Sequence, residues 1–369
     1  MKIAQIAPLI ESVPPRGYGG TERVVSHLTE ELVRQGHEVT LFASGDSVTA
    51  ARLVACAPRS LRNDPLANDP LPYNVYQIEQ VRQRAEAFDI LHFHTDYVQF
   101  PIFRKQRPVT LTTLHGRLDL PDLRLLFEEF RDMPLVSISH SQRRPLSGVN
   151  WAGNVYHGLP GDLLTPTDQP SGDYLAFLGR ICPEKRPDRA IEIACRAGLP
   201  LRIAAKVDRV DQDYFDTCIL PLLARPGIEF IGEIGESDKS AFLGNALALL
   251  FPIDWPEPFG LTMIEAMAGG TPTIAWPCGS VPEIIEEGLC GFMVRDMDTA
   301  VEAVGRVKEL DRKAIRQRFE TRFSSTRMAA DYLALYESMT EPPEFWLPDP
   351  SRQPLKAALR RESAHGPRG

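Results

Sequence analysis

Residues 3–43 read IAQIAPLIESVPPRGYGGTERVVSHLTEELVRQGHEVTLFA, and this stretch decides the fold class. The apolar run at residues 3–7 predicts a buried strand. Apolar side chains at helical spacing predict a helix over residues 21–35 that stops at Gly36. Residues 38–43 predict a second strand. A strand, a crossover helix and another strand indicate a parallel sheet covered by helices.

The same rhythm continues along the chain and restarts near Asp173. It predicts further strands at residues 90–94, 109–114, 135–139, 174–179, 201–205, 228–231, 246–251 and 273–275. It predicts further helices at residues 187–197, 239–245 and 261–268, followed by helix-rich sequence to about residue 340. We therefore expect two doubly wound, Rossmann-like α/β domains that face each other across a cleft.

The segment at residues 159–172 is rich in Pro, Gly, Asp and Thr, so we place the domain boundary there. The expected units are a first Rossmann-like domain at 1–165 and a second at 166–325. A C-terminal helix at 326–345 is expected to pack back on the first domain, and residues 346–369 form a basic flexible tail.

Composition narrows the class of protein. The 369 residues are 43% hydrophobic and 24% charged, which is typical of a globular protein. The chain has no apolar run of about 18 residues that would span a membrane, and its first apolar run is too short for a signal peptide. Six cysteines without a C-x-x-C pair favour a reducing cytoplasm. The net charge of −8 argues against a nucleic-acid partner.

A glycine-rich loop precedes the first helix and contains Gly19, Gly20 and Thr21. Glycines allow the backbone to approach a ligand, and the unpaired amides of a helix N-terminus favour a phosphate. The loop lacks the G-x-G-x-x-G spacing, so a tight strand–helix turn is the alternative. Arg180 and Lys185 follow the first strand of the second half, where two cations would neutralise a diphosphate. The alternative there is a solvated charge cluster.

The most specific segment is DWPEPFGLTMIEAMAGG at residues 254–270. Glu257 lies in the loop before the predicted helix, and Glu265 lies inside that helix. Between them, the first amides of the helix are unpaired donors, those of Phe259, Gly260, Leu261 and Thr262. A phosphate would fit between the two carboxylates, and each carboxylate would accept hydrogen bonds from hydroxyl groups beside it. A sugar–diphosphate–ribose ligand has this layout. The alternative is two surface glutamates.

These segments, with GSVPE at residues 279–283, resemble the retaining glycosyltransferases of family 4, which have the GT-B fold. Several further segments are similar to the subgroup that contains the avilamycin-pathway glycosyltransferase. The resemblance implies that Glu257 contacts the transferred sugar, Glu265 binds the ribose, and Arg180 and Lys185 hold the diphosphate. Gly19 and Gly20 would approach it from the other domain.

The resemblance also implies that His115 lies near the reacting carbon and the acceptor, which makes it a catalytic candidate with Glu257, Arg180 and Lys185. The base of the nucleotide would lie near residues 206–207 and 231–233, which include Glu233. The chain departs from the family at His157, where an Asn is usual. We place that change at the entry to the linker.

The acceptor side is expected to be lined by His94, Asp96, His115 and Arg117, polar side chains that suit a hydroxylated small molecule or glycan. A metal site at His92 and His94, with His115 as a further ligand, is an alternative. The D-x-D patterns at residues 211–213 and 296–298 are interpreted as chance matches, the first of them at a helix start. We expect no metal and no cofactor. Residues 100–107 mix apolar and basic side chains; they favour a helix over the sheet, with membrane contact as the alternative.

The expected activity is transfer of a sugar from a nucleotide-diphosphate-sugar, such as a UDP- or GDP-sugar, to a hydroxylated acceptor. The resemblance implies retention at the anomeric carbon without a metal. Two alternatives stay open: a nucleotide-sugar epimerase of the same fold, and a nucleotide-sugar-binding protein without catalysis.

Overall fold

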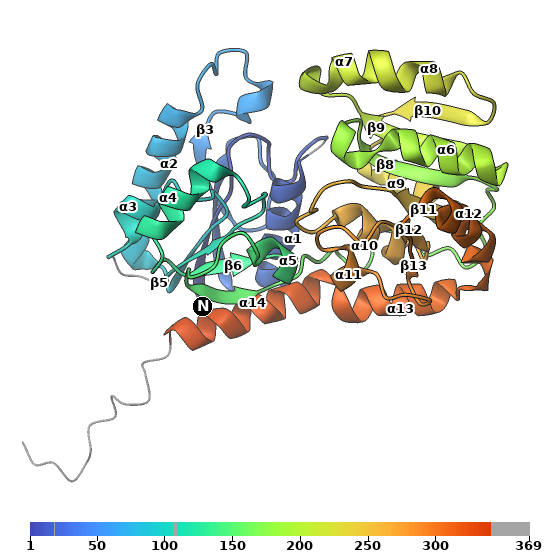
Figure 1. Ribbon diagram of the computed structural model, residues 1–369. Helices are drawn as coiled ribbons and strands as arrows, with labels where there is room; N and C mark the ends of the chain where they lie inside the picture. Colours follow the sequence, from blue (N-terminus) through green and yellow to red (C-terminus); the bar gives the residue numbers. More distant parts are fainter. Residues whose placement is uncertain (18, 106–108, 341–369) are drawn as a thin grey trace, which may run out of the picture.

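Two parallel β-sheets, one in each half of the chain, organise the molecule (Figure 1). The structure is a computed structural model that describes residues 1–17, 19–105 and 109–340. The tail expected at residues 346–369 lies outside the described residues, as does the end of the helix expected at 326–345. Each sheet is covered by helices on both faces. The predicted fold class, α/β with two Rossmann-like units, is therefore confirmed.

The first sheet has the strand order β3-β2-β1-β4-β5-β6-β7. Its strands are β1 (Lys2–Ile6), β2 (Glu38–Ser44), β3 (Arg52–Ala57), β4 (Ile90–Phe93), β5 (Val109–Thr113), β6 (Leu135–Ser137) and β7 (Trp151–Asn154). Ile3 pairs in parallel with Val39 of β2 and Ile90 of β4, so β1 lies at the centre of the sheet. This register points the carboxyl ends of all these strands to one edge.

The helices of the first half are α1 (Gly20–Arg34), α2 (Leu71–Arg82), α3 (Phe100–Phe103), α4 (Pro121–Glu129) and α5 (His140–Arg143). On one face of the sheet, Val24 and Leu28 of α1 are buried against Ile3. On the other face, Ile78 and Val81 of α2 are buried against the sheet. The segment expected as a covering helix at residues 100–107 is the single turn α3 in its described part, with Phe100 and Phe103 buried.

The second sheet has the order β10-β9-β8-β11-β12-β13. Its strands are β8 (Leu175–Arg180), β9 (Leu201–Lys206), β10 (Ile228–Gly232), β11 (Ala248–Phe251), β12 (Thr273–Ala275) and β13 (Gly291–Met293). The helices are α6 (Pro187–Ala197), α7 (Gln212–Tyr214), α8 (Leu220–Leu223), α9 (Glu236–Gly244), α10 (Leu261–Ala268), α11 (Val281–Ile284), α12 (Met297–Arg306) and α13 (Arg312–Arg322). Side chains of α9, α10 and α13 fill one face of the sheet, and those of α6 and α12 fill the other.

The chain passes between the two halves twice, and the two passages touch. The Leu159 amide donates to the Phe323 carbonyl at 2.9 Å, and the Ser325 amide donates to the Leu159 carbonyl at 2.8 Å. A Cβ on Gly158 would lie 2.3 Å from the Ser324 carbonyl oxygen, so the close approach requires glycine.

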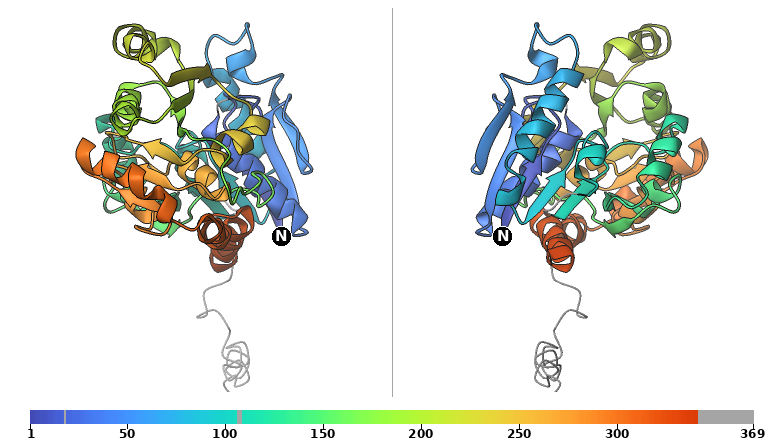
Figure 2. Two further views of the ribbon diagram at one scale, coloured as in Figure 1. Left: turned by 90° about the vertical axis from the view of Figure 1, so that its right-hand side faces the viewer. Right: turned by 90° about the vertical axis from the view of Figure 1, so that its left-hand side faces the viewer.

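The last described helix, α14 (Ser325–Thr340), returns to the first half of the chain. It contacts α1, and Met328, Tyr332 and Tyr336 are fully buried in the core that surrounds Ile3. Figure 2 shows α14 end-on at the lower edge of the molecule. Within the described ranges, no helix is long and apolar enough to cross a membrane.

Candidate active site

A cavity of about 350 Å³ lies between the two halves, lined by residues of both. It is built at the carboxyl ends of the strands, where α/β sheets leave room for ligands. The cavity brings together these residues singled out from the sequence: Gly19, Gly20, Thr21, His115, Arg117, Arg180, Lys185, Glu233, Glu257, Phe259, Gly260, Leu261, Thr262 and Glu265. The structure places His94 and Asp96 outside this lining: His94 is buried behind His115, and Asp96 is on an exposed loop.

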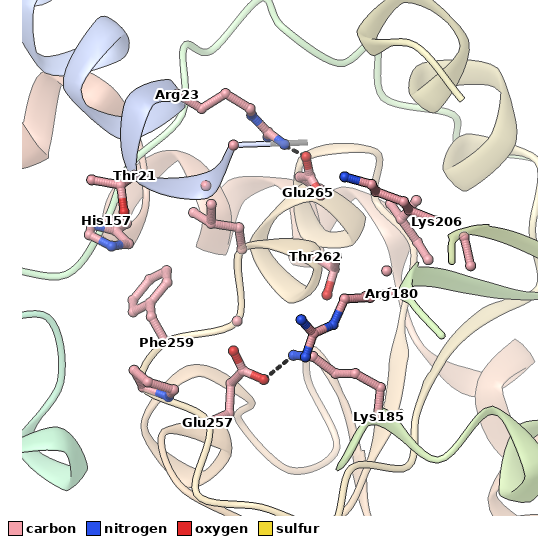
Figure 3. A pocket seen from close by; sticks show the side chains of 18 of the residues that line it. Thr21, Arg23, His157, Arg180, Lys185, Lys206, Glu257, Phe259, Thr262 and Glu265 are labelled. Carbon is pink, nitrogen blue, oxygen red and sulfur yellow. Dashed lines mark hydrogen bonds and ion pairs between the residues drawn. The ribbon is translucent and has the colours of Figure 1, made fainter. Parts of the chain in front are cut away.

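Glu257 and Lys185 form an ion pair across the floor of the cavity (Figure 3). The Trp255 indole also donates to Glu257 Oε2 at 2.9 Å, and Lys185 Nζ lies 5.3 Å from the centre of the Trp255 ring. Glu257 is 9% exposed, and these donors replace the hydrogen bonds to water that it loses on burial. The pair presents one anionic and one cationic group on the same side of the cavity.

Glu265 is held on the opposite side of the cavity by two cations (Figure 3). Arg23 of α1 and Lys239 of α9 both donate to its Oε1, Lys239 at 2.9 Å. Burial alone would raise the pKa of Glu265, but the charges of Arg23 and Lys239 outweigh burial and lower the pKa to about 2. Glu265 therefore remains a carboxylate that accepts hydrogen bonds.

The N-terminus of α10 lies between these two glutamates. Gly260 caps it with φ +83°, and no side chain caps the helix, so its first amides have no side-chain acceptor. The Thr262 hydroxyl is buried without a hydrogen-bond partner among the described residues. Free amides, the helix dipole and an unpaired hydroxyl together suit an anionic ligand group.

Arg180, at the end of β8, is surrounded by carboxylates. Its guanidinium lies 3.5 Å from Asp211, 3.7 Å from Asp208 and 3.9 Å from Glu184. Asp211 of the first D-x-D pattern is thus an ion-pair partner of Arg180. In the second pattern, Asp296 caps α12 by accepting from the Thr299 amide at 2.8 Å. One aspartate of each pattern thus has an ion-pair or hydrogen-bond partner within the protein.

His115 and His157 stack on the side of the cavity that faces the first sheet, with ring centres 5.2 Å apart. His157 also packs edge-on against Phe259 at 4.8 Å. From the sequence, His157 is expected at the linker entry and outside the donor site. The structure instead places His157, at the start of the first crossing, in the wall of the cavity.

His92 and His94 are buried on one face of β4 and its end, with ring centres 4.1 Å apart. His92 bonds the Tyr336 and Thr113 hydroxyls, each at 2.7 Å. In the described part of the chain, no group of three or more His, Cys, Asp or Glu side chains is placed to hold a metal ion. These hydrogen bonds, and those of His94 to Gln5 and His115, compensate the burial of the two imidazole rings.

Arg23, Lys239 and Glu283 are further residues that the sequence analysis did not single out. Arg23 lies on the first turn of α1 and Lys239 on α9, so only the fold brings them to Glu265. Glu283 of α11 accepts from the His140 and Ser141 amides at 2.8 and 2.7 Å, which ties the two halves together. The GSVPE segment was visible in the sequence, but its role in joining the halves was not.

Comparison with known proteins agrees with this architecture. Residues 167–322 match the family described as Glycosyl transferases group 1, and residues 18–153 match Glycosyltransferase Family 4. The fold and the cavity between its halves therefore define a two-domain glycosyltransferase. The chain belongs to glycosyltransferase family 4, and the resemblance seen in its motifs is confirmed.

The similar curated proteins carry glycosyltransferase names. A "D-inositol 3-phosphate glycosyltransferase" of Mycolicibacterium smegmatis is 26% identical over 80% of this chain and 79% of its own length. A "Phosphatidyl-myo-inositol mannosyltransferase" of Mycobacterium leprae is 24% identical over 92% and 97%. A Streptomyces scabiei relative, also named D-inositol 3-phosphate glycosyltransferase, is 33% identical, but the match spans only 43% of this chain and 36% of that protein.

Solved structures share the fold. The avilamycin A pathway glycosyltransferase AviGT4 superposes with a TM-score of 0.69 at 21% identity, covering 92% of this chain and 98% of that one. Anabaena Alr3699/HepE, solved in complex with UDP and glucose, superposes with a TM-score of 0.68 at 18% identity, covering 92% and 100%. At these identities the likeness shows the fold alone.

Proposed function

We propose that this protein transfers a hexose from a nucleotide-diphosphate-sugar to a hydroxylated acceptor, with retention at the anomeric carbon and without a metal. One observation carries the proposal: Glu257 and Glu265 flank the N-terminus of α10 in a cavity that both halves line. An anion at the helix start would be the diphosphate, with the sugar on the side of Glu257 and the ribose on the side of Glu265.

Departure of the nucleoside diphosphate builds negative charge, which this chain is equipped to stabilise. Lys185, Arg180 and the free amides of α10 all line the cavity, and such fixed donors are effective because they need no rearrangement during reaction. Since these groups would neutralise a bound diphosphate, we propose that a divalent cation is not required.

The two glutamates also bear on the stereochemical course. A double displacement needs a carboxylate free to attack the anomeric carbon. Glu257 is bound to Lys185 and Trp255, and Glu265 is bound to Arg23 and Lys239. We therefore propose attack by the acceptor hydroxyl on the face from which the diphosphate leaves, with the leaving phosphate taking the proton.

The acceptor would enter beside His115 and Arg117, on the wall that the first half provides. Relatives named for inositol phosphate and phosphatidylinositol suggest a polyol as the first acceptor class to assay. A UDP-sugar is the first donor to assay, since HepE was solved with UDP and glucose. The free cysteines (Cys56, Cys182, Cys195, Cys218, Cys278 and Cys290) support a cytoplasmic enzyme.

The first test is thermal unfolding of the full chain with UDP, GDP, ADP, TDP and CDP, each with and without a chelator. A nucleotide at about 100 times its Kd stabilises by about 2.7 kcal/mol, which raises Tm by a few degrees. We expect one nucleotide to give this shift in both conditions. Absence of any shift contradicts the donor site, and a shift abolished by the chelator contradicts the metal-free proposal.

The second test follows the matching sugar nucleotide by NMR in the presence of polyol acceptors. A product with the anomeric configuration of the donor supports retention, and the opposite configuration contradicts it. Conversion of the donor without any acceptor would identify an epimerase. Binding without consumption across the acceptor panel would identify a binding protein.

A further inference from the structure

A chain of hydrogen bonds runs from the centre of the first sheet to His115. Gln5 lies on β1, His94 follows β4, and His115 follows β5. Gln5 Oε1 lies 2.8 Å from His94 Nε2, and His94 Nδ1 lies 2.8 Å from His115 Nε2. Gln5 and His94 are buried, so water does not compete for these bonds.

The direction of each bond follows from the chemistry of Gln5. Its amide oxygen only accepts, so His94 Nε2 carries the proton between them. The other end of the amide, Gln5 Nε2, donates to the Tyr336 hydroxyl at 3.3 Å, which keeps the amide in this orientation. A neutral His94 protonated on Nε2 has a lone pair on Nδ1, and this lone pair accepts from His115 Nε2–H.

Burial favours the neutral form of both imidazole rings, in which each ring carries one proton. Burial lowers the pKa of His94 well below its usual value, and it lowers the pKa of His115 to about 3. Neighbouring histidines act in the same direction on His94. Both rings are therefore neutral near pH 7, and the tautomer of one determines the tautomer of the other.

Within the hydrogen-bonded chain of Gln5, His94 and His115, one ring nitrogen has no partner. His115 Nδ1 is buried and has no hydrogen-bond partner among the described residues. Its ring lines the cavity and is stacked on His157, so it cannot turn freely. An unpaired acceptor at the cavity wall calls for a donor from a ligand, and a hydroxyl group is the donor that a sugar offers.

We propose that Gln5 and His94 are positioning residues that hold His115 as the neutral Nε2–H tautomer, so that its Nδ1 accepts a hydrogen bond from a hydroxyl of the bound sugar or acceptor. The identity of that ligand rests on the proposed function, whereas the tautomer does not. It follows that His115 orients a hydroxyl and does not deliver a proton to the leaving group.

The tautomer is tested by long-range ¹H–¹⁵N correlation spectra of the full chain labelled with ¹⁵N-histidine. Pyrrole-type (protonated) and pyridine-type (unprotonated) ring nitrogens resonate far apart, and loss of a signal set in His115→Asn assigns His115. We expect a pyrrole-type Nε2 and a pyridine-type Nδ1 at neutral pH. A protonated Nδ1 in the wild-type protein overturns the proposal without any need for a variant to fold.

Two substitutions at His94 separate positioning from packing. His94→Leu removes the acceptor of the His115 proton, so we expect both His115 nitrogens to shift toward a tautomer average. His94→Gln restores an acceptor for His115 and a donor for Gln5, so we expect the wild-type pattern. His92→Leu is the packing control: it removes the neighbouring buried histidine, which makes no bond to His115. His92 Nδ1 lies 3.4 Å from Gln5 Nε2, but the bond of Gln5 Nε2 to the Tyr336 hydroxyl remains in this variant. An unchanged His115 spectrum in His94→Leu contradicts the positioning role of His94.

The ligand step is tested by adding UDP-glucose or GDP-mannose, and separately the free UDP or GDP, to the labelled protein. We expect the sugar nucleotide that binds, with its acceptor present, to shift Nδ1, while the free nucleotide leaves it in place. In His94→Leu we expect kcat to fall about tenfold, which is the loss of one hydrogen bond in the transition state, with the donor KM within about twofold. An equal fall in His92→Leu would assign the effect to packing. If no donor is consumed at all, the proposed function fails while the tautomer result still stands.

Discussion

Glu265 shows how a single buried carboxylate remains charged at the centre of this site. It is 1% exposed, and its Oε1 receives both Arg23 from the first half and Lys239 from the second. A buried charge of this kind costs free energy unless partners compensate it. The two cations do so, and they also join the halves through one oxygen atom.

Glu265→Gln should destabilise the protein at pH 7 by about 3–5 kcal/mol, because it removes the buried carboxylate that Arg23 and Lys239 share, while the exposed Glu236 stays beside both cations. The pKa of Glu265 in the folded protein is about 2, below its usual value of 4.5. Its contribution is therefore complete above pH 4.5 and is lost as the pH falls toward 2. Urea unfolding at several pH values should show the difference between variant and wild type shrinking on acidification. Glu302→Gln, at an exposed position, is the control, and an equal effect there would contradict this account.

Lys185→Ala should lower the rate of sugar transfer by about two orders of magnitude or more, because it removes a fixed cation from the leaving diphosphate. The comparison is kcat of the variant and wild type, measured with the donor that the nucleotide panel identifies. Lys313→Ala is the control, since Lys313 is a surface residue paired with Asp168. Transfer at the wild-type rate by Lys185→Ala would remove Lys185 from the proposed machinery.

Among the elements, the start of α10 combines a left-handed turn that requires glycine with backbone amides that have no side-chain acceptor. Gly260 adopts φ +83°, and a Cβ there would lie 2.6 Å from Met263 Cε. The helix thus begins in the cavity without a capping side chain. One loop and one helix thus supply the free amides of the site, whereas its charged side chains come from both halves.

Gly260→Ala should destabilise the protein by about 1–3 kcal/mol, because a Cβ is strained at this φ and meets Met263. It should also reduce the Tm shift produced by the nucleotide. Gly36→Ala provides a matched comparison: Gly36 has φ +88°, but a Cβ there meets nothing within 4 Å, and it is at the far end of α1. We expect Gly36→Ala to lose some stability with an undiminished nucleotide shift. The same reduction in both variants would show that general destabilisation is the cause.

At the scale of the whole molecule, the two halves are held by several separate ties. Glu283 accepts two amides from α5 and the Tyr156 hydroxyl at 3.0 Å. The Ser139 hydroxyl donates to the Pro258 carbonyl at 2.7 Å, close to Glu257. The alignment of the halves therefore depends on residues next to the site. A substitution that weakens these contacts should also alter the geometry of the site.

Glu283→Ala should separate the unfolding of the two halves, because it removes the acceptor of three donors at their junction. Differential scanning calorimetry should show one main transition in the wild type and two in the variant. Glu287→Ala is the control, since Glu287 accepts the Met293 amide at 2.7 Å within the second half alone. A single transition in Glu283→Ala, unchanged in width, would count against a tie at this position.

The strands that were not predicted from the sequence all lie at the edges of their sheets. β3, β7 and β13 are edge strands of their sheets. Edge strands have one strand neighbour and are less completely buried, so their sequences lack the continuous apolar runs that marked β1 and β4. The helices α2 and α4 were missed too, and most of their side chains are exposed or only partly buried.

The class of fold, the family and the main motifs could all be recognised from the order of the residues. Buried parallel strands need unbroken apolar runs, and phosphate-type loops need glycines and a following helix, so both leave a local signature. Which polar and charged side chains meet depends on the folded chain: Arg23 with Glu265, Asp211 with Arg180, and Gln5 with His94. These pairs are far apart in the chain, and nothing in local spacing encodes them. These pairs form because the fold brings the ends of distant strands and helices together. A buried polar or charged group there costs free energy unless it has a partner.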